Sequence, residues 1–263
     1  MCIIVYKPKD NKFPTNETLK TCFENNPDGA GFMYPARDGV HIRKGFMTYK
    51  DFKKAVKPFK DKNIPMIFHF RISTHAGITP EMTQPFPLTS KTKKLKALES
   101  TARVGVAHNG IISLTSDAKS ISDTALFIKK YLTLLIRDPK YYKDPKIAKI
   151  IDKLIGSKMA VLSRDGHVEL IGSGWELGED GIWYSNDSYK PWDWRSYYKG
   201  LYSDPYYDYG WYNFAYEDGD APWELSEEER KEWEEYRETC EMRSATDGAS
   251  CYGCEYEEMC MAV

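Results

Sequence analysis

The sequence has no apolar run long enough to cross a membrane. A spanning helix needs about 20 predominantly apolar residues, and polar or charged residues interrupt every apolar stretch of this chain well before that length. The N-terminus also lacks the basic segment and long apolar stretch of a secretory signal peptide. Without an export signal, the six cysteines are better explained as thiols or metal ligands than as disulfides. These absences predict a cytoplasmic protein with no membrane partner.

The chain also lacks a strong net charge, but its charges are unevenly distributed. The formal net charge is −2, which does not favour direct binding of nucleic acid. Residues 190–263 hold 7 Lys/Arg against 19 Asp/Glu, a net of −12, and the preceding residues carry a net of +10. A basic body with an acidic tail suits an anionic partner, although solvation alone also explains the asymmetry.

Short β-forming segments alternate with helical ones over the first 189 residues. Strands are expected near residues 2–6, 31–34, 40–43, 66–72, 104–107, 159–162, 167–171 and 182–185, and helices near 15–24, 48–56, 122–136 and 147–154. Asp38-Gly39 and Asp165-Gly166 each join two of these strands and are typical hairpin turns. Strands in antiparallel pairs with clustered helices predict an α+β fold and not a doubly wound parallel sheet.

The composition changes after residue 189 and divides the chain into three parts. Residues 1–189 form the expected folded domain. Residues 190–225 are acidic and rich in aromatics with few aliphatic side chains, which favours a disordered linker over a segment packed on the body. Ser226-Glu227-Glu228-Glu229 is a capping box that opens a charged helix, so residues 226–263 are expected to be a helix followed by a Cys-rich tail.

Cys2 directly follows the initiator Met. Removal of Met1 before this small residue would leave Cys2 with a free α-amine, which can serve as the base for its own thiol. No separate His would then be required. A cysteine at position two is common, however, and by itself it carries little weight.

Four downstream segments strengthen the case for chemistry at Cys2. They are polar or glycine-rich loops beside predicted strands, or a helix start: residues 26–32 (NPDGAGF), 69–77 (HFRISTHAG), 104–110 (VGVAHNG) and 122–124 (SDT). Each also has a structural explanation, because Asn-Gly and Asp-Gly form turns, Arg71 can form a surface ion pair and Asp123 can cap a helix. The order and the spacing of all four together carry more information than any one of them.

Together with Cys2, these segments resemble the class II glutamine amidotransferases, a branch of the N-terminal-nucleophile hydrolases. The resemblance spans residues 2 to about 186 and includes residues 83–86 (TQPF), similar to the loop that folds over bound glutamine, and the closing residues 183–186 (WYSN). It implies that residues 1–189 are a glutamine amidotransferase type 2 domain. It also implies a four-layer αββα sandwich, in which two antiparallel sheets lie between helical layers.

The resemblance implies a catalytic role for three residues. Cys2 would attack the glutamine amide carbon and form a γ-glutamyl thioester, with its α-amine taking the thiol proton. The Asn109 side chain and the Gly110 backbone N–H would form the oxyanion hole. No cofactor is needed for this hydrolysis.

It further implies a set of substrate-binding residues. Arg71 would hold the α-carboxylate of glutamine as a bidentate fork, and Asp123 would hold its α-ammonium group. The remaining candidates shape the pocket near Cys2 and the loop over glutamine: Asp28, Gly29, Thr74, His75 and Gly77.

Two departures from the family keep alternatives open. Ile3 follows Cys2 where many relatives have Gly, and nothing after residue 190 is large enough for a synthase domain. We therefore expect a glutamine amidohydrolase that delivers ammonia to a separate synthase or acceptor-modifying enzyme. The alternatives are another N-terminal-nucleophile amidase or acylase, and a catalytically inactive fold used for binding.

The tail holds four of the six cysteines. Cys240, Cys251, Cys254 and Cys260 are spaced as thiolate ligands for Zn²⁺ or for an iron–sulfur cluster. An unstructured tail with free thiols explains the same pattern, so metal binding stays an open prediction.

Overall fold

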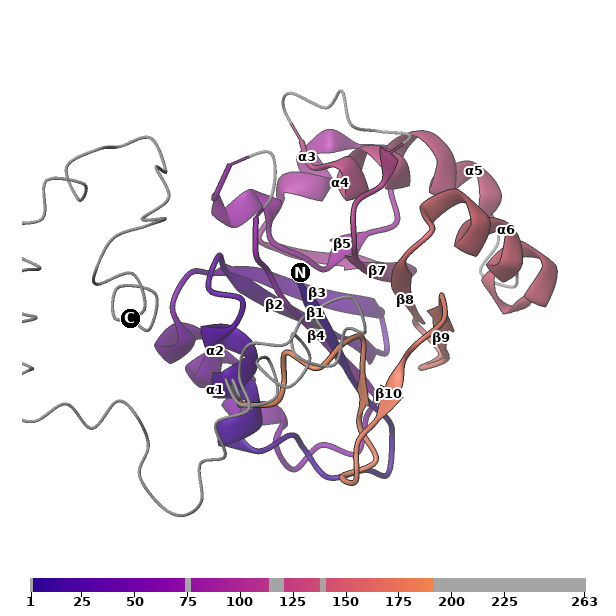
Figure 1. The fold of residues 1–263 in the computed structure, drawn as a ribbon. Coiled ribbons are helices and arrows are strands. Elements are labelled where there is room, and N and C mark those ends of the chain that lie inside the picture. Colours follow the sequence, from indigo (N-terminus) through magenta and orange to yellow (C-terminus); the bar gives the residue numbers. More distant parts are fainter. Residues whose placement is uncertain (1, 74–76, 114–120, 138–140, 192–263) are drawn as a thin grey trace, which may run out of the picture. The chain divides into compact units, whose positions relative to one another are not determined.

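The computed structural model describes residues 2–73, 77–113, 121–137 and 141–191. These residues form two antiparallel β-sheets with helices packed on both of them (Figure 1). The α+β class expected from the sequence is confirmed, and so are the antiparallel sheets.

The larger sheet has seven strands in the order β10-β11-β1-β4-β2-β3-β6. Every pairing in it is antiparallel. Its strands, in chain order, are β1 (Ile3–Lys7), β2 (Ala30–Ala36), β3 (Gly39–Phe46), β4 (Met66–Phe70), β6 (Glu99–Ala102), β10 (Glu176–Leu177) and β11 (Trp183–Tyr184).

The smaller sheet has four strands in the order β5-β7-β8-β9, and it is also antiparallel throughout. They are β5 (Phe86–Pro87), β7 (Val104–Asn109), β8 (Lys158–Ser163) and β9 (Val168–Ile171). The two predicted hairpins are confirmed as β2–β3 and β8–β9.

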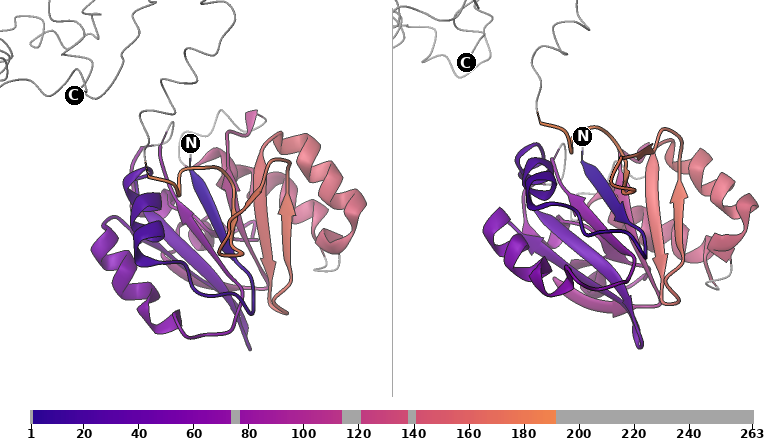
Figure 2. Two further views of the ribbon diagram at one scale, coloured as in Figure 1. Left: turned by 60° about the horizontal axis from the view of Figure 1, so that its bottom comes forward. Right: turned by 90° about the horizontal axis from the view of Figure 1, so that it is seen from below.

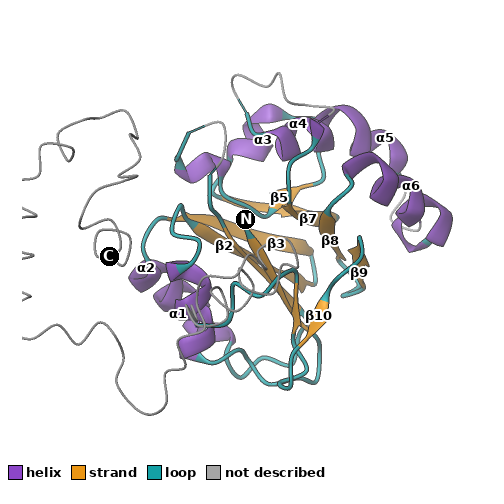
Figure 3. Cartoon of the chain, viewed as in Figure 1, coloured by secondary structure: helices purple, strands orange, loops and turns teal. Residues whose placement is uncertain are grey.

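Three of the helices drawn in Figure 3 begin directly after a residue that caps them. Thr15 caps α1 (Asn16–Glu24), Thr48 caps α2 (Tyr49–Val56) and Ser122 caps α4 (Asp123–Phe127), each by accepting a backbone N–H two or three residues into its helix. The other helical segments are α3 (Thr92–Lys96), α5 (Thr133–Leu135), α6 (Pro145–Ile155), a π-helical turn (Ile128–Leu132), and 3₁₀ turns at Lys57–Phe59, Pro80–Met82 and Tyr141–Lys143.

Three apolar clusters show how these elements are layered. One cluster joins α1 and α2 to the outer face of the larger sheet, and another joins α4, α6 and the π-helical turn to the outer face of the smaller sheet. The third lies between the sheets and includes Ile4, Ile67, Ala107 and Ala160. Figure 2 shows the resulting order of helices, sheet, sheet and helices. Residues that alternate along one strand therefore face either a helical layer or the second sheet.

Some elements were not predicted from the sequence. Strand β6 is polar and half-exposed, and β5 and β10 have only two residues each, so none of them carries a strong periodic pattern. The helix expected over 122–136 is present but contains the π-helical turn. The expected linker and the charged helix, beyond residue 191, lie outside the described residues.

Candidate functional site

Three neighbouring strands of the larger sheet, β1, β4 and β2, have ends that lie side by side. In the antiparallel register, Ile3 of β1 and Ala30 of β2 both pair with Phe70 of β4. Cys2, Gly29 and Arg71 are the next residues outward on these three strands. The fold thus brings together three residues that the sequence places at positions 2, 29 and 71.

Cys2 lies at the start of β1 with a partly buried side chain. Its Sγ is 3.4 Å from the carbonyl oxygen of Ile72, and its own carbonyl accepts a hydrogen bond of 2.8 Å from Asn186 Nδ2. Burial raises the pKa of the Cys2 thiol above its usual range, while the Ile72 contact and the positive charge of Arg71 lower it. Because burial has the larger effect, the thiol is protonated at neutral pH and needs a base before it can act as a nucleophile.

Arg71 lies just beyond β4 and is 5% exposed. Its Nη2 donates to Ser73 Oγ and to the carbonyl of Gly77, both at 2.9 Å, so the guanidinium helps to hold the loop that follows β4. Burial lowers the pKa of Arg71, and the negative charges of Cys2, Asp28 and Asp123 oppose that shift. The negative charges of Asp28 and Asp123 therefore lie close enough to the Arg71 guanidinium to change its pKa.

Asp28 and Gly29 form the turn that leads into β2. One Asp28 carboxylate oxygen accepts the backbone N–H of Ser73 at 2.6 Å, which links this turn to the loop after β4. Gly29 has φ +107°, and a Cβ there would lie 2.6 Å from the Thr83 side chain. The conformation and the close approach both require glycine at position 29.

Asn109 and Gly110 lie at the end of β7, on the second sheet. The Asn109 side chain is 6% exposed, and its Nδ2 is 2.8 Å from Ser185 Oγ. Ser185 Oγ also accepts the backbone N–H of Ile4, two residues from Cys2. Gly110 has φ +143°, and a Cβ there would meet Ser157 at 2.5 Å. Asn109, one of the two expected oxyanion residues, is thus joined to β1 through a single serine hydroxyl.

Asp123 is the first residue of α4, and Ser122 is the residue that caps this helix. The Asp123 carboxylate accepts the backbone N–H of Ile112 at 2.8 Å and that of Thr124 at 2.7 Å. It therefore fixes the turn after β7 to the start of α4. A carboxylate can accept about four hydrogen bonds, so this structural role is compatible with a second one toward a ligand.

Two buried histidines near the site were not singled out from the sequence. His69 Nε2 is 3.0 Å from the carbonyl oxygen of His108, and the His108 ring contacts Thr124 Oγ1 and Ser157 Oγ. Burial lowers the pKa of His69 to about 3 and that of His108 to about 4. Both rings are neutral at physiological pH, and their contacts hold the end of β7. A lone His inside an otherwise apolar strand was the available signal.

Gln84, in the segment expected to fold over glutamine, is buried as well. Its Oε1 accepts the backbone N–H of His108 at 2.8 Å. This side chain is therefore used to attach the 83–86 segment to β7, next to the expected oxyanion residues.

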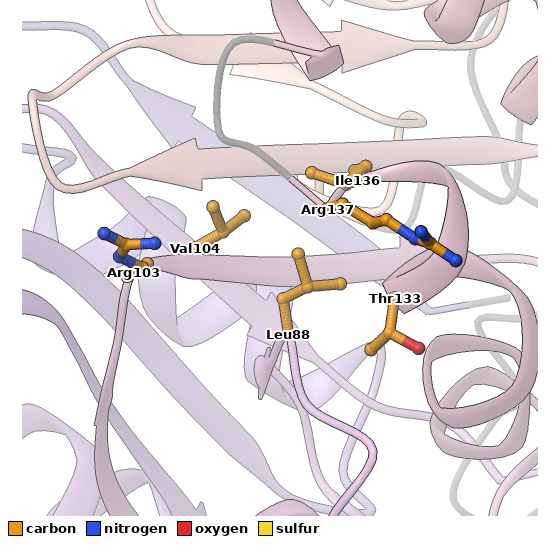
Figure 4. Close-up of a pocket in the computed structure, with 6 residues that line it drawn as sticks. All are labelled: Leu88, Arg103, Val104, Thr133, Ile136 and Arg137. Atoms are coloured by element: carbon orange, nitrogen blue, oxygen red, sulfur yellow. The ribbon is translucent and has the colours of Figure 1, made fainter.

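A separate open cavity of about 280 Å³ lies at the other end of β7 (Figure 4). Its lining combines an apolar floor with two exposed arginines: Leu88, Arg103, Val104, Thr133, Ile136 and Arg137. Val104 begins the strand that Asn109 ends, so roughly 17 Å of strand separates this cavity from the expected site. None of its lining residues is a strong nucleophile, and we place the candidate active site at the Cys2 end.

The structure thus brings together seven of the residues proposed from the sequence: Cys2, Asp28, Gly29, Arg71, Asn109, Gly110 and Asp123. Thr74 and His75 lie outside the described residues, as do the four tail cysteines Cys240, Cys251, Cys254 and Cys260. In the ranges that the structure describes, no group of three His, Cys, Asp or Glu side chains could hold a metal ion. The predicted metal site in the tail stays a prediction.

No model of a known protein family matches this chain, and neither does any curated protein. Among the helices of the described residues, none has both the length and the apolar character needed to span a membrane. The geometry of the site is therefore what indicates a function.

Proposed function

We propose that this protein is a glutamine amidohydrolase of the N-terminal-nucleophile type, with Cys2 as its nucleophile. The observation that carries the proposal is the position of the Arg71 guanidinium, whose pKa responds to the charges of both Cys2 and Asp123. A cation beside the thiol, with the Asp123 carboxylate close enough to act on that cation, matches the α-carboxylate and α-ammonium groups of a free amino acid. The layered arrangement of two sheets between helices is the one that such hydrolases share.

The chemistry follows from the groups at the strand ends. After removal of Met1, the α-amine of Cys2 takes the thiol proton, and the sulfur attacks the side-chain amide carbon of glutamine. The tetrahedral oxyanion accepts hydrogen bonds from the Asn109 side chain and the Gly110 N–H. The C–N bond then breaks, the nitrogen receives the proton and leaves as ammonia, and a γ-glutamyl thioester remains. Water, deprotonated by the same amine, hydrolyses the thioester to glutamate and restores the thiol.

The chemical state of Cys2 supports a separate base. Because burial raises the thiol pKa, a thiolate does not form spontaneously at neutral pH. The hydrogen bonds of the two nearby histidines run to the His108 carbonyl, Thr124 and Ser157, and none of those found among the described residues joins Cys2. An α-amine has an ordinary pKa of about 8 and suits the role.

The first test is intact mass spectrometry of the purified protein before and after treatment with 6-diazo-5-oxo-L-norleucine, a reactive glutamine analogue. We expect a mature mass without Met1 and one adduct per chain, mapped by peptide analysis to Cys2. Cys2→Ala should abolish the adduct, and Cys22→Ala should keep it, since Cys22 is a fully buried core residue.

Ammonia release from glutamine is measured in parallel. A retained Met1, or a trimmed protein that gains no adduct and releases no ammonia, would contradict the proposal and favour a binding module. Release of ammonia from other amides, but not from glutamine, would instead favour another amidase of the same fold. The release of free ammonia also fits a protein that serves a separate synthase or acceptor-modifying enzyme.

A further inference from the structure

The hydrogen bonding between Asn109 and Ser185 is incomplete in one specific way. Asn109 Oδ1 is fully buried and contacts no donor in the described part of the chain. Ser185, which is 0% exposed, accepts two hydrogens at Oγ, one from the Ile4 N–H and one from Asn109 Nδ2, both at 2.8 Å. No described residue accepts the hydrogen of the Ser185 hydroxyl itself. One buried acceptor thus lacks a donor while the adjacent buried donor lacks an acceptor.

A half-turn of the Asn109 carboxamide removes both defects. The oxygen and nitrogen of an amide have nearly the same shape, so their assignment follows from the hydrogen-bond network. With Oδ1 toward Ser185, the hydroxyl donates its hydrogen to Asn109 and still accepts the Ile4 N–H. Nδ2, with two N–H donors, then occupies the side of the amide that no described residue contacts. The half-turn therefore pairs the buried serine hydrogen with Oδ1 and leaves Nδ2 as the unpaired group, a donor that a substrate oxygen can fill.

We propose that Ser185 is a positioning residue that holds the Asn109 carboxamide with Nδ2 directed toward the reacting oxygen of the substrate. This inference rests on the proposed glutaminase function. An oxyanion needs donors, and a carboxamide turned the other way would present a carbonyl oxygen and repel it. The serine hydroxyl is suited to this selection, because its hydrogen needs an acceptor and the Asn109 carboxamide can supply one only through Oδ1.

The position of Ser185 is itself fixed from three directions. Its backbone N–H donates to the carbonyl of Ile4 at 3.0 Å, and its carbonyl accepts Lys158 Nζ. Lys158 pairs with Asn109 across the neighbouring strands β8 and β7. The next residue, Asn186, donates to the carbonyl of Cys2. Residues 185–186 therefore set the distance between the nucleophile strand and the strand that carries the oxyanion donor.

The test is a double-mutant cycle with Ser185→Ala and Asn109→Ala, measured as ammonia release from glutamine. In the wild-type background we expect Ser185→Ala to lower kcat about 10- to 100-fold with KM within about twofold, because the loss concerns the transition state. In the Asn109→Ala background it should lower kcat by less than about threefold, since a residue that acts through Asn109 has nothing left to position. The alkylation rate of Cys2 by iodoacetamide, which uses no oxyanion hole, should not change.

Three further variants keep the result interpretable. Ser185→Thr retains the hydroxyl and should recover most of kcat. Asn109→Asp accepts the Ser185 hydrogen but has no donor, so it should lose as much kcat as Asn109→Ala. Ser163→Ala removes another buried serine hydroxyl, at the far end of β8, and should leave kcat unchanged.

Thermal unfolding of each variant shows whether it is folded, since Ser185→Ala also leaves the Ile4 N–H without its acceptor. If Ser185→Ala does not fold, Asn109→Asp decides which group of the residue 109 side chain faces the substrate. The Asp variant has no side-chain N–H, so it retains activity only if an oxygen faces the substrate in the wild type. Wild-type kcat in Ser185→Ala, equal losses in both backgrounds, or an active Asn109→Asp would each overturn the inference. A wild-type protein that releases no ammonia from glutamine would overturn the proposed function and this inference together, whereas the other results concern Ser185 alone.

Discussion

Cys2 and Arg71 leave neighbouring antiparallel strands at the same edge of the larger sheet, and each changes the pKa of the other. The guanidinium favours the thiolate, and the thiolate favours the charged guanidinium. The same arginine holds the loop after β4 through Ser73 and Gly77. One side chain therefore links the ionisation of the Cys2 thiol to the positions of Ser73 and Gly77.

Arg71→Met should make the Cys2 thiol harder to ionise. The charge of Arg71 lowers a thiol pKa that burial raises, so its removal should raise the pKa of Cys2 further. Alkylation of Cys2 by iodoacetamide at a fixed pH near 8 should therefore become slower, and its pH profile should move to higher pH. The KM for glutamine should rise about 100-fold or more, as expected for the loss of a charge-assisted bidentate contact.

Arg43→Met is the matched control for that experiment. Arg43 is a partly exposed arginine on β3 that pairs with Glu99, away from Cys2. An equal fall in the alkylation rate of Cys2 in both variants would show that Arg71 has no specific influence on the thiol.

Asp123→Asn should weaken glutamine binding. The amide cannot hold an α-ammonium group as strongly as a carboxylate does, so KM should rise at least about tenfold. In the variant, the amide group replaces the carboxylate that accepts the Ile112 and Thr124 N–H groups, and it is a weaker acceptor. This should lower the stability by about 1 kcal/mol. Steady-state kinetics and urea unfolding measure the two effects separately.

Ser122→Ala distinguishes binding from helix capping. It removes the side chain that caps α4 and should also cost about 1 kcal/mol of stability, but it leaves the Asp123 carboxylate in place. If Ser122→Ala raises KM as much as Asp123→Asn does, the role of Asp123 is structural only.

Gly110→Ala should reduce activity and stability together. The backbone at Gly110 has φ +143°, which L-residues rarely adopt, and the new Cβ would lie 2.5 Å from Ser157 Cβ. The strain is of the order of 1–3 kcal/mol, and relief of the contact would move the N–H that we propose as an oxyanion donor. Gly166→Ala is a suitable comparison, because it has φ +83° but no neighbour closer than 3.6 Å, and it lies in the distant β8–β9 turn. Equal kcat in the two variants would argue against a role of the Gly110 N–H.

Lys44 should make the stability of the protein rise with pH. Its Nζ is buried among the carbonyls of Glu81 and Leu95 and the ring of Phe86, and burial lowers its pKa from 10.5 to about 6. Between these values the unfolded chain holds a proton that the folded chain does not, so raising the pH favours folding. The free energy of unfolding should rise by at most about 1.4 kcal/mol per pH unit. Below pH 6 the amine is protonated in both states, and the cost of burying its charge is then complete.

Urea unfolding at several pH values between 6 and 9 measures this contribution. Lys44→Met should remove it, so the difference between wild type and variant should change with pH in that window. Lys53→Met, at an exposed position of α2, should follow the wild type. Parallel curves for wild type and Lys44→Met would show that the buried amine keeps its proton.

Local sequence patterns predicted much of the fold. The caps Thr15, Thr48 and Ser122 act within one helical turn, and the Asp-Gly turns act within one hairpin, so each can be recognised from neighbouring residues. The short strands β5 and β10 could not be predicted, because a pairing of two residues depends on where a distant strand lies.

The sequence by itself determined the chemical inventory of the site: a thiol at position two, a guanidinium, two carboxylates and an Asn-Gly turn, each beside a strand or helix end. The tertiary structure decided which of these groups meet. It placed Cys2 beside Arg71 through the register of β1 and β4, and it joined Asn109 to β1 through Ser185, 76 positions further along the chain. It also gave Gln84 and the two histidines structural contacts. Hydrogen bonds between residues far apart in the sequence depend on how the two sheets pack against each other. No local sequence pattern specifies that packing.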